Sequence, residues 1–158
     1  MKKENINKIV LVSLCDNFSN QLATALSRTL DMVFCDTNAL VEYELVDKNA
    51  MEKLCSPQYL KSCERKVLKH IASFENVVVS ISYDYLIHNI DVLKYNSAVV
   101  FVELPKVFVK NNGDALAILA FDERTKNLKE LADVNIAVRK TEIDFISRKI
   151  IENLGSVL

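Results

Sequence analysis

Glycine is almost missing from this sequence, whose 158 residues contain only Gly113 and Gly155. Loops that bind phosphate through their backbone need glycine, because the chain must adopt positive φ and approach the phosphate closely. A glycine-rich phosphate loop and the G-x-S-x-G turn of serine hydrolases are therefore excluded. The start of the chain nevertheless has the strand–turn–helix order of a nucleoside-phosphate site.

Several other signals are absent as well. The net charge of −1 gives no reason to expect a nucleic acid or a membrane as partner. No apolar run approaches the length of about 18 residues that a membrane-spanning helix needs, and the first residues do not read as a signal peptide. The cysteines form no C-x-x-C pair, and His70 and His88 lie far apart, so we expect no metal site. We predict a cytoplasmic protein with reduced thiols, of which Cys15 is either reactive or buried and inert.

Apolar runs alternate with amphipathic segments along the whole chain. Continuous β-branched runs are typical of strands that are covered on both faces. We expect strands at residues 8–12, 32–35, 76–80, 97–104 and 134–138. We expect helices at residues 20–30, 39–46, 58–74, 83–93 and 142–154, and a mainly helical region at 105–131. This order predicts one domain over residues 1–158, a three-layer α/β/α fold with a five-stranded parallel sheet.

In this order of elements the chain resembles the shikimate kinase family, small P-loop kinases of the nucleoside monophosphate kinase type. The segment LDMVFCDTN at residues 30–38 resembles the family's leucine, hydrophobic strand and D-x-D turn. The segment DERTKNLKELADV at residues 122–134 resembles the family's E-R-x-P-L-Y-x-E-x-A-D segment. The resemblance covers nearly the whole chain and implies a P-loop kinase topology and a link to aromatic amino acid biosynthesis.

The family's phosphate loop, G-x-x-x-x-G-K-[ST], falls on the segment SLCDNFSN. Ser13 and Phe18 replace the two glycines. Ser19 replaces the lysine, and Asn20 replaces the hydroxyl that binds magnesium. Asp16 adds a negative charge inside the loop, which repels phosphate. We therefore predict a degenerate loop that does not hold a triphosphate, and in which Ser19 or Asn20 instead caps the following helix.

The resemblance also places the family's magnesium and substrate positions on this chain. Asp36 corresponds to the acid that holds magnesium, and it would be the catalytic residue of an active protein. Asn38 can bind hydroxyls but cannot act as a base, and the same turn can instead cap a helix. Lys61 stands where the family has a substrate-binding arginine, or is a solvated helix residue.

Two further positions complete this set of substrate-pocket candidates. Tyr83 replaces part of a glycine turn and is expected to fill or block the pocket. Arg124 matches the family's carboxylate-binding arginine, and it either binds a carboxylate or pairs with Asp122 or Glu123 on a helix surface. The family's lid falls on about residues 105–121, which contain no arginine, so we expect it to be remodelled into fixed structure.

These changes predict a shikimate kinase-like pseudoenzyme that has no catalytic residues and needs no cofactor. We expect it to bind a small carboxylate ligand or a protein partner. The alternative is an active phosphotransferase that uses ATP and magnesium at an atypical phosphate site, with positive charge from Lys106, Lys110 and Lys126. A third hypothesis is an interaction module that binds neither.

Overall fold

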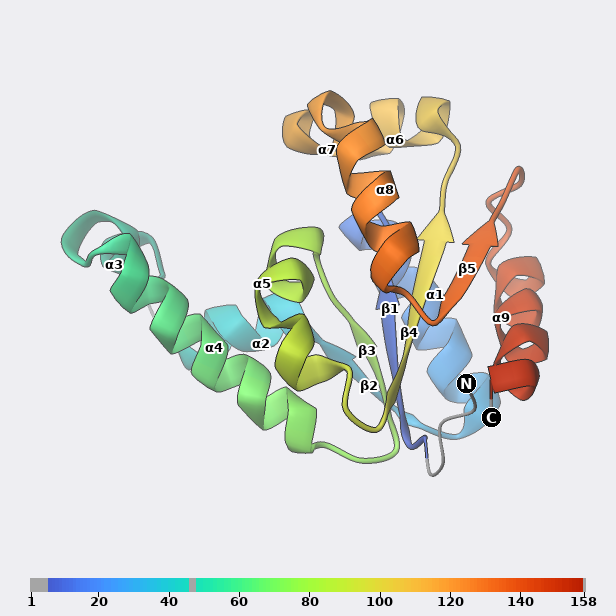
Figure 1. Cartoon of the computed structure of the whole chain (residues 1–158), viewed down its shortest axis with the longest axis horizontal. Helices are drawn as coiled ribbons and strands as arrows, with labels where there is room; N and C mark the ends of the chain where they lie inside the picture. The colour runs from blue at the N-terminus through green and yellow to red at the C-terminus, as the bar shows by residue number, and fades with distance from the viewer. Residues whose placement is uncertain (1–5, 46–47, 158) are drawn as a thin grey trace.

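The centre of the molecule is a five-stranded parallel sheet with helices on both faces (Figure 1). The structure, a computed structural model, describes residues 6–45 and 48–157. The strands are β1 (Lys8–Val12), β2 (Val33–Asp36), β3 (Val77–Ser80), β4 (Ser97–Glu103) and β5 (Val134–Ala137). They lie in the order β2-β3-β1-β4-β5, and all neighbours are parallel. The predicted three-layer fold is confirmed.

The helices connect the strands across the two faces of the sheet. They are α1 (Asp16–Leu30), α2 (Thr37–Glu44), α3 (Lys48–Leu54), α4 (Pro57–Ser73), α5 (Tyr83–Leu93), α6 (Lys106–Asn112), α7 (Ala115–Leu119), α8 (Phe121–Leu131) and α9 (Ile143–Val157). Helices α1 and α9 pack together on one face of the sheet, with α9 at the right-hand side of Figure 1, whereas α5 and α8 lie on the other face. No described helix is long and apolar enough to cross a membrane.

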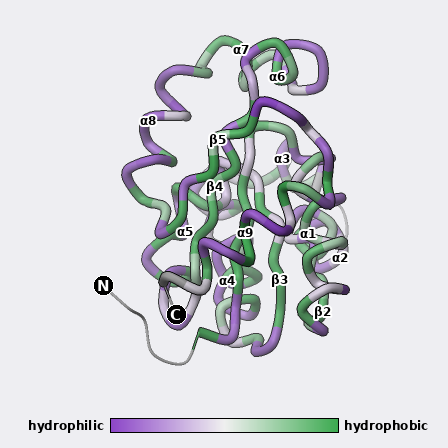
Figure 2. Tube along the Cα trace, turned by 90° about the vertical axis from the view of Figure 1, so that its right-hand side faces the viewer, coloured by the Kyte–Doolittle hydropathy of each residue, from purple (hydrophilic) through white to green (hydrophobic). Residues whose placement is uncertain are grey.

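Burial follows the pattern that the sequence predicted for the central strands. All of β1 is buried, and Val10, Leu11 and Val12 are fully inaccessible to solvent. The neighbouring strands β3 and β4 are also hydrophobic over most of their length (Figure 2). Strands that are buried on both faces can hold apolar side chains at every position, so no alternation with polar residues is needed.

Two differences from the sequence prediction concern helices. The segment 48–54 forms α3, which we did not anticipate. The helix expected over residues 39–46 is α2, which begins at Thr37, and the expected last residue lies outside the described part of the chain. The predicted start of α4 is confirmed, because Pro57 occupies its first turn and the Ser56 side chain accepts a hydrogen bond from Tyr59 N at 3.2 Å.

Helix α1 begins at Asp16, earlier than the predicted start at residue 20. Phe18 and Leu22 are four residues apart and both buried, so packing of one helix face against the core extends the helix towards the sheet. Its N-cap is Cys15, which makes no side-chain capping bond. The prediction that Ser19 or Asn20 caps this helix is therefore wrong, since both lie inside it.

Candidate ligand-binding site

The turn between β1 and α1 consists of Ser13, Leu14 and Cys15, and all three are buried. In the described residues, positive φ occurs only at Asp31, Asn76 and Asn96, so this turn has none. Backbone nests that bind anions need residues in a left-handed conformation, so that successive N–H groups converge. The turn therefore runs directly into the helix without forming such a nest.

Hydroxyl groups of the turn bond to one another and to the local backbone. Ser13 Oγ accepts a hydrogen bond from Cys15 N at 3.2 Å and lies 2.6 Å from Ser19 Oγ. Ser19 Oγ also bonds to Cys15 O at 3.3 Å. Because both serines are buried, these bonds satisfy polar groups that water cannot reach.

Phe18, in the first turn of α1, packs against helix α6. Its ring is buried and packs edge-on against Phe108 of α6, with the ring centroids 5.5 Å apart. Helix α6 is capped by Gly113, where an added Cβ would lie 2.7 Å from Val109 O, so a side chain there would clash with the backbone. Figure 1 shows α6 and α7 above the carboxyl ends of the strands, where they cover one side of the site.

The side chain of Asn20 in α1 links the carboxyl ends of strands β2 and β3 through hydrogen bonds. Its Nδ2 donates to Asp36 Oδ2 at 3.1 Å, and its Oδ1 accepts a hydrogen bond from Ser80 Oγ. The other oxygen of Asp36 accepts from Ala39 N at 3.3 Å and thereby caps α2. Both carboxylate oxygens of Asp36 thus have protein donors, and the bond from Ala39 N is the helix cap that the alternative interpretation of this turn predicted.

A cavity of about 680 Å³ lies beside these groups, over the carboxyl ends of the strands. Its walls come from α1, α2, α4, α5, α8 and the connection between α6 and α7. Three of the predicted substrate-pocket residues line it, namely Asn38, Tyr83 and Arg124. Tyr83 stands in the wall without filling the space. Asp36 and Lys61 do not line this cavity.

Arg124 is held against one wall of the cavity. Its guanidinium lies 4.6 Å from the centroid of the Tyr83 ring and 3.9 Å from Asp84 Oδ1. Tyr83 is itself fixed, because its hydroxyl accepts a hydrogen bond from Asn127 Nδ2 at 2.9 Å. The only ion pair in which the described residues place Arg124 is with Asp84 of α5, and not with Asp122 or Glu123 of its own helix.

Carboxylates dominate the charge of the cavity. Its described lining contains one cationic side chain, Arg124, and five acidic ones, which are Asp16, Glu42, Glu64, Asp84 and Asp114. Burial raises the pKa of Asp16, and the nearby carboxylates of Asp114 and Asp36 raise it further. The hydrogen bond from Asn38 Nδ2 at 3.4 Å and the charge of Arg124 act in the opposite direction.

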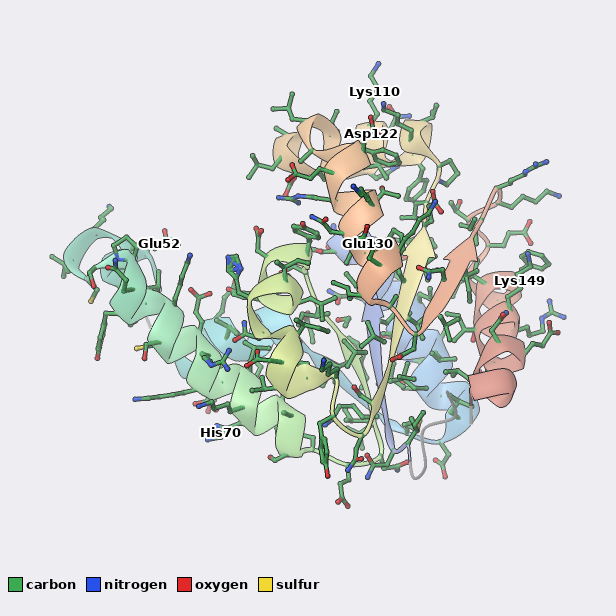
Figure 3. All side chains as sticks on the ribbon, in the orientation of Figure 1. Glu52, His70, Lys110, Asp122, Glu130 and Lys149 are labelled. Atoms are coloured by element: carbon green, nitrogen blue, oxygen red, sulfur yellow. The ribbon has the colours of Figure 1, made fainter. Side chains whose placement is uncertain are left out.

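The remaining cationic candidates lie elsewhere. Lys61 lines a second groove of about 760 Å³ between α4 and α5. Lys106, Lys110 and Lys126 are exposed and do not line the first cavity, and Lys110 points away from the molecule (Figure 3). None of these lysines therefore adds positive charge to the cavity wall.

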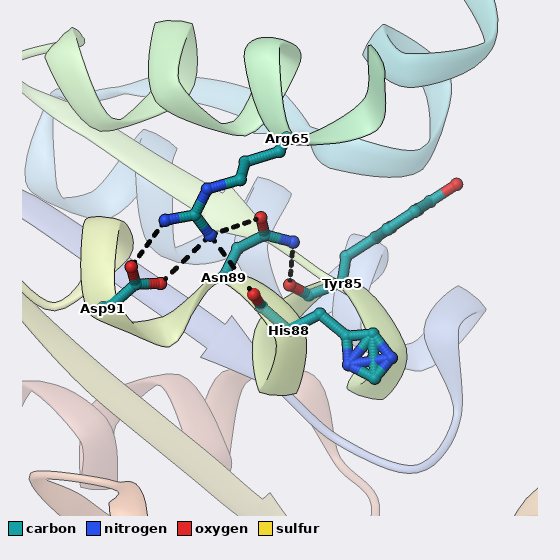
Figure 4. A network of polar contacts seen from close by, with 5 residues as sticks. All are labelled: Arg65, Tyr85, His88, Asn89 and Asp91. Carbon is teal, nitrogen blue, oxygen red and sulfur yellow. Dashed lines mark hydrogen bonds and ion pairs between the residues drawn. The ribbon is translucent and has the colours of Figure 1, made fainter. Parts of the chain in front are cut away.

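An ionic network that sequence reasoning missed joins α4 to α5 (Figure 4). Arg65 Nη2 lies 2.5 Å from Asp91 Oδ2, and Arg65 Nη1 lies 3.4 Å from both Asn89 Oδ1 and His88 O. Asn89 has non-helical φ and ψ, and its Nδ2 donates to Tyr85 O at 2.8 Å. The network fixes a kink in α5, the helix that carries Tyr83 and Asp84 to the cavity.

Cys15 is the thiol nearest to the turn. Burial, together with the charges of Asp16 and Asp114, raises its pKa to about 11. Thiolate is the reactive form of cysteine, so at neutral pH this side chain is almost entirely in the unreactive form. The structure therefore agrees with the buried, inert interpretation. No group of described His, Cys, Asp and Glu side chains could hold a metal ion.

The architecture is that of known small-molecule kinases. No protein-family model matches the sequence, and no curated protein matches it. The structure is similar to shikimate kinase from Aquifex aeolicus, with 22% identity and a TM-score of 0.73 over 94% of this chain and 96% of that one. It is also similar to shikimate kinase from Bacteroides thetaiotaomicron, with 16% identity and a TM-score of 0.78 over 94% and 98%.

A third similar structure is shikimate kinase from Acinetobacter baumannii in complex with shikimate, with 17% identity and a TM-score of 0.69 over 97% of this chain and 95% of that one. These likenesses extend over nearly the whole of each chain. They show that this chain has the shikimate kinase-like fold that the sequence motifs predicted.

Proposed function

We propose that this protein is a non-catalytic relative of the small-molecule kinases, which binds a small ligand in its cavity without transferring phosphate. The observation that carries the proposal is the turn between β1 and α1, which has no residue with positive φ and in which the side chains of two serines bond to each other. A triphosphate needs a backbone nest and a lysine at this place in the fold. Here Ser13 and Ser19 bond to each other, and Asp16 places a negative charge in the first turn of α1, where it would repel a triphosphate.

Magnesium fits the site no better than the triphosphate does. Asp36 corresponds to the family's magnesium-binding acid, but its two oxygens accept hydrogen bonds from Asn20 and Ala39. Asn20 stands where the family has the hydroxyl that binds magnesium, and it presents an N–H donor to Asp36 at 3.1 Å. Neither ATP nor magnesium therefore has a part in the function that we propose.

The remodelled cover of the site supports the same proposal. A kinase lid must open and close to admit nucleotide and exclude water. Here α6 is tied to α1 through the contact between Phe18 and Phe108, and its C-cap Gly113 leaves room for Val109 O of the same helix, which an added Cβ would meet at 2.7 Å. We infer that residues 105–121 form a fixed wall of a single domain.

Isothermal titration calorimetry with Mg-ATP tests the proposal directly. We expect no binding at millimolar nucleotide, and micromolar affinity would overturn the proposal. A coupled assay with shikimate and ATP tests the alternative of an active phosphotransferase, which Arg124 in the cavity wall favours. Turnover above the blank would establish that alternative.

A further inference from the structure

The outer side of strand β2 is a free edge of the described sheet. Val33 N donates to Asn76 O at 2.9 Å, so the backbone groups of Val33 face β3. Successive residues of a strand direct these groups to opposite sides, and those of Phe34 therefore point away from the sheet. An edge of this kind can pair with an added strand, and proteins commonly protect it with lysine or proline. The sequence of β2, VFCD, contains neither.

Strand β5, at the other edge of the sheet, has a different surface. Its buried and exposed positions alternate, and the exposed ones are Asn135 and Ala137. In β2, by contrast, Val33 is 64% exposed, and Phe34 and Cys35 are only half-buried. Apolar side chains that the fold leaves uncovered beside a free strand indicate a surface that a partner covers.

A groove of about 620 Å³ lies along this edge, between β2, α2 and the connection from α4 to β3. Apolar side chains form most of its wall, among them Val33, Leu40, Tyr43 and Phe74. Tyr43 belongs to α2, which lies beside β2 (Figure 2), and it is 80% exposed. The groove shares no described lining residue with the cavity over the strand ends, so the two are separate surfaces.

Both ends of the groove carry a negative charge. Asp36 lies at the carboxyl end of β2, and Glu75 lies just before β3, beside the amino end of β2. The groups of Asn20 and Ala39 that bond to Asp36 are neutral, so they leave its charge in place. Lys8 attracts Glu75, but its ammonium is buried and bonds to a carbonyl of α4. The described lining of the groove contains no cationic side chain.

This charge pattern argues against a second copy of the chain as the occupant. A twofold axis would pair the two β2 strands antiparallel, with the carboxyl end of each beside the amino end of the other. Asp36 of one copy would then approach Glu75 of the second copy, and like charges that face each other are destabilising. A strand with a cation at each end would be attracted instead.

We propose that this groove binds an extended segment of a partner protein, which has apolar side chains in its middle and a lysine or arginine at each end. The segment adds a strand outside β2, and its backbone forms hydrogen bonds with the N–H and C=O groups of Phe34. Its apolar side chains contact Val33 and Tyr43, and its cations lie near Asp36 and Glu75. The inference goes beyond the proposed function and does not depend on it, because the cavity is a different surface.

Two fluorescent peptides, KVTVTVK and EVTVTVE, serve as probes that differ only in the charge of their ends. Polarisation titrations at low ionic strength should show that KVTVTVK binds about tenfold more tightly, and added salt should reduce the difference. Amide hydrogen exchange at Phe34 should become slower when KVTVTVK is bound, because this N–H joins the added strand. Equal binding of the two peptides, no binding of either, or unchanged exchange at Phe34 would overturn the inference.

Variants locate the binding in the groove. Tyr43→Ser removes an apolar side chain and should weaken the binding of KVTVTVK at least about fivefold, and Glu75→Gln should weaken it about threefold. Leu119→Ser is the matched control, because Leu119 is 83% exposed on α7 and lies outside the groove. Thermal unfolding verifies that each variant is folded. Natural affinity in both groove variants contradicts the inference.

Sedimentation equilibrium of the chain alone tests the second copy as occupant. We expect Tyr43→Ser to leave the measured mass unchanged, because no other copy covers the groove. A dimer that dissociates in this variant would assign the groove to a second copy and overturn the inference, while the proposed function would still depend on the titration with Mg-ATP.

Discussion

Strand β1 and the turn that follows it are adjacent in sequence but are held in place by different kinds of interaction. Val10, Leu11 and Val12 are fully buried among apolar side chains, and many other apolar residues could replace them. Ser13 and Ser19, by contrast, depend on particular hydrogen bonds with defined partners. The comparison teaches that a kinase-like frame is compatible with many turns, while the chemistry of the turn depends on individual residues.

The largest expected effect comes from the sheet itself. Phe101 of β4 is 1% exposed, so Phe101→Ala removes a buried ring and leaves a cavity. We expect it to lower the free energy of unfolding by about 3–5 kcal/mol, as measured by urea denaturation. Leu119→Ala is the control, because Leu119 is 83% exposed. An equal loss in both variants would contradict the assignment of the core.

A smaller effect is expected where the turn meets α6. Phe18→Ala removes the contact with Phe108, and we expect it to cost about 3 kcal/mol, because Phe18 is 6% exposed whereas Phe101 is 1% exposed. Amide hydrogen exchange of residues 106–112 should become faster, since α6 loses its anchor to α1. Unchanged exchange there would show that the cover does not depend on Phe18. Phe145→Ala, at a half-exposed ring of α9, serves as control.

The polar cluster at the strand ends gives the next prediction. Asn20→Ala leaves Asp36 Oδ2 and Ser80 Oγ without their partner. We expect a loss of about 1–2 kcal/mol in the free energy of unfolding. Gln21→Ala is the matched control, since Gln21 is the next residue of α1 and is exposed. If both variants unfold at the same urea concentration, the bonds of Asn20 do not stabilise the fold.

The smallest effect is expected at Asp16. Removal of its charge should raise the free energy of unfolding at neutral pH, whereas the other substitutions lower it. Burial raises the pKa of this carboxyl in the folded state, so its ionised form disfavours folding. The stabilising effect of its proton is fully present below the unfolded pKa and is lost as the pH rises through the folded value. Asp16→Asn should therefore be more stable than the natural protein at neutral pH, and the difference should vanish in acid.

Chemical denaturation of both proteins from pH 4 to pH 8 measures this difference. If Asp16→Asn is less stable than the natural protein at neutral pH, the charge of Asp16 stabilises the fold and the expected sign is contradicted.

The candidate site was only partly accessible to prediction. Replacement of the family's glycines and lysine by Ser13, Phe18 and Ser19 indicated a changed turn, since residue type alone carries that information. The partners of these side chains were not accessible in the same way. Asn20 bonds to Ser80, which is 60 positions away, and no periodicity reports such a pair. The kink at Asn89 and the Arg65 network that holds it also left no signal in the sequence.

The sequence by itself determined the layers of this protein and, apart from α3, the order of its strands and helices, because continuous β-branched runs separated by amphipathic segments are typical of a parallel sheet that helices cover on both faces. It also determined that the first turn lacks the residues of a phosphate cradle. Only the tertiary structure decided what replaced that cradle. The acids of the cavity come from segments that are far apart in the chain, and only the packing of the helices around the strand ends brings their charges to one wall.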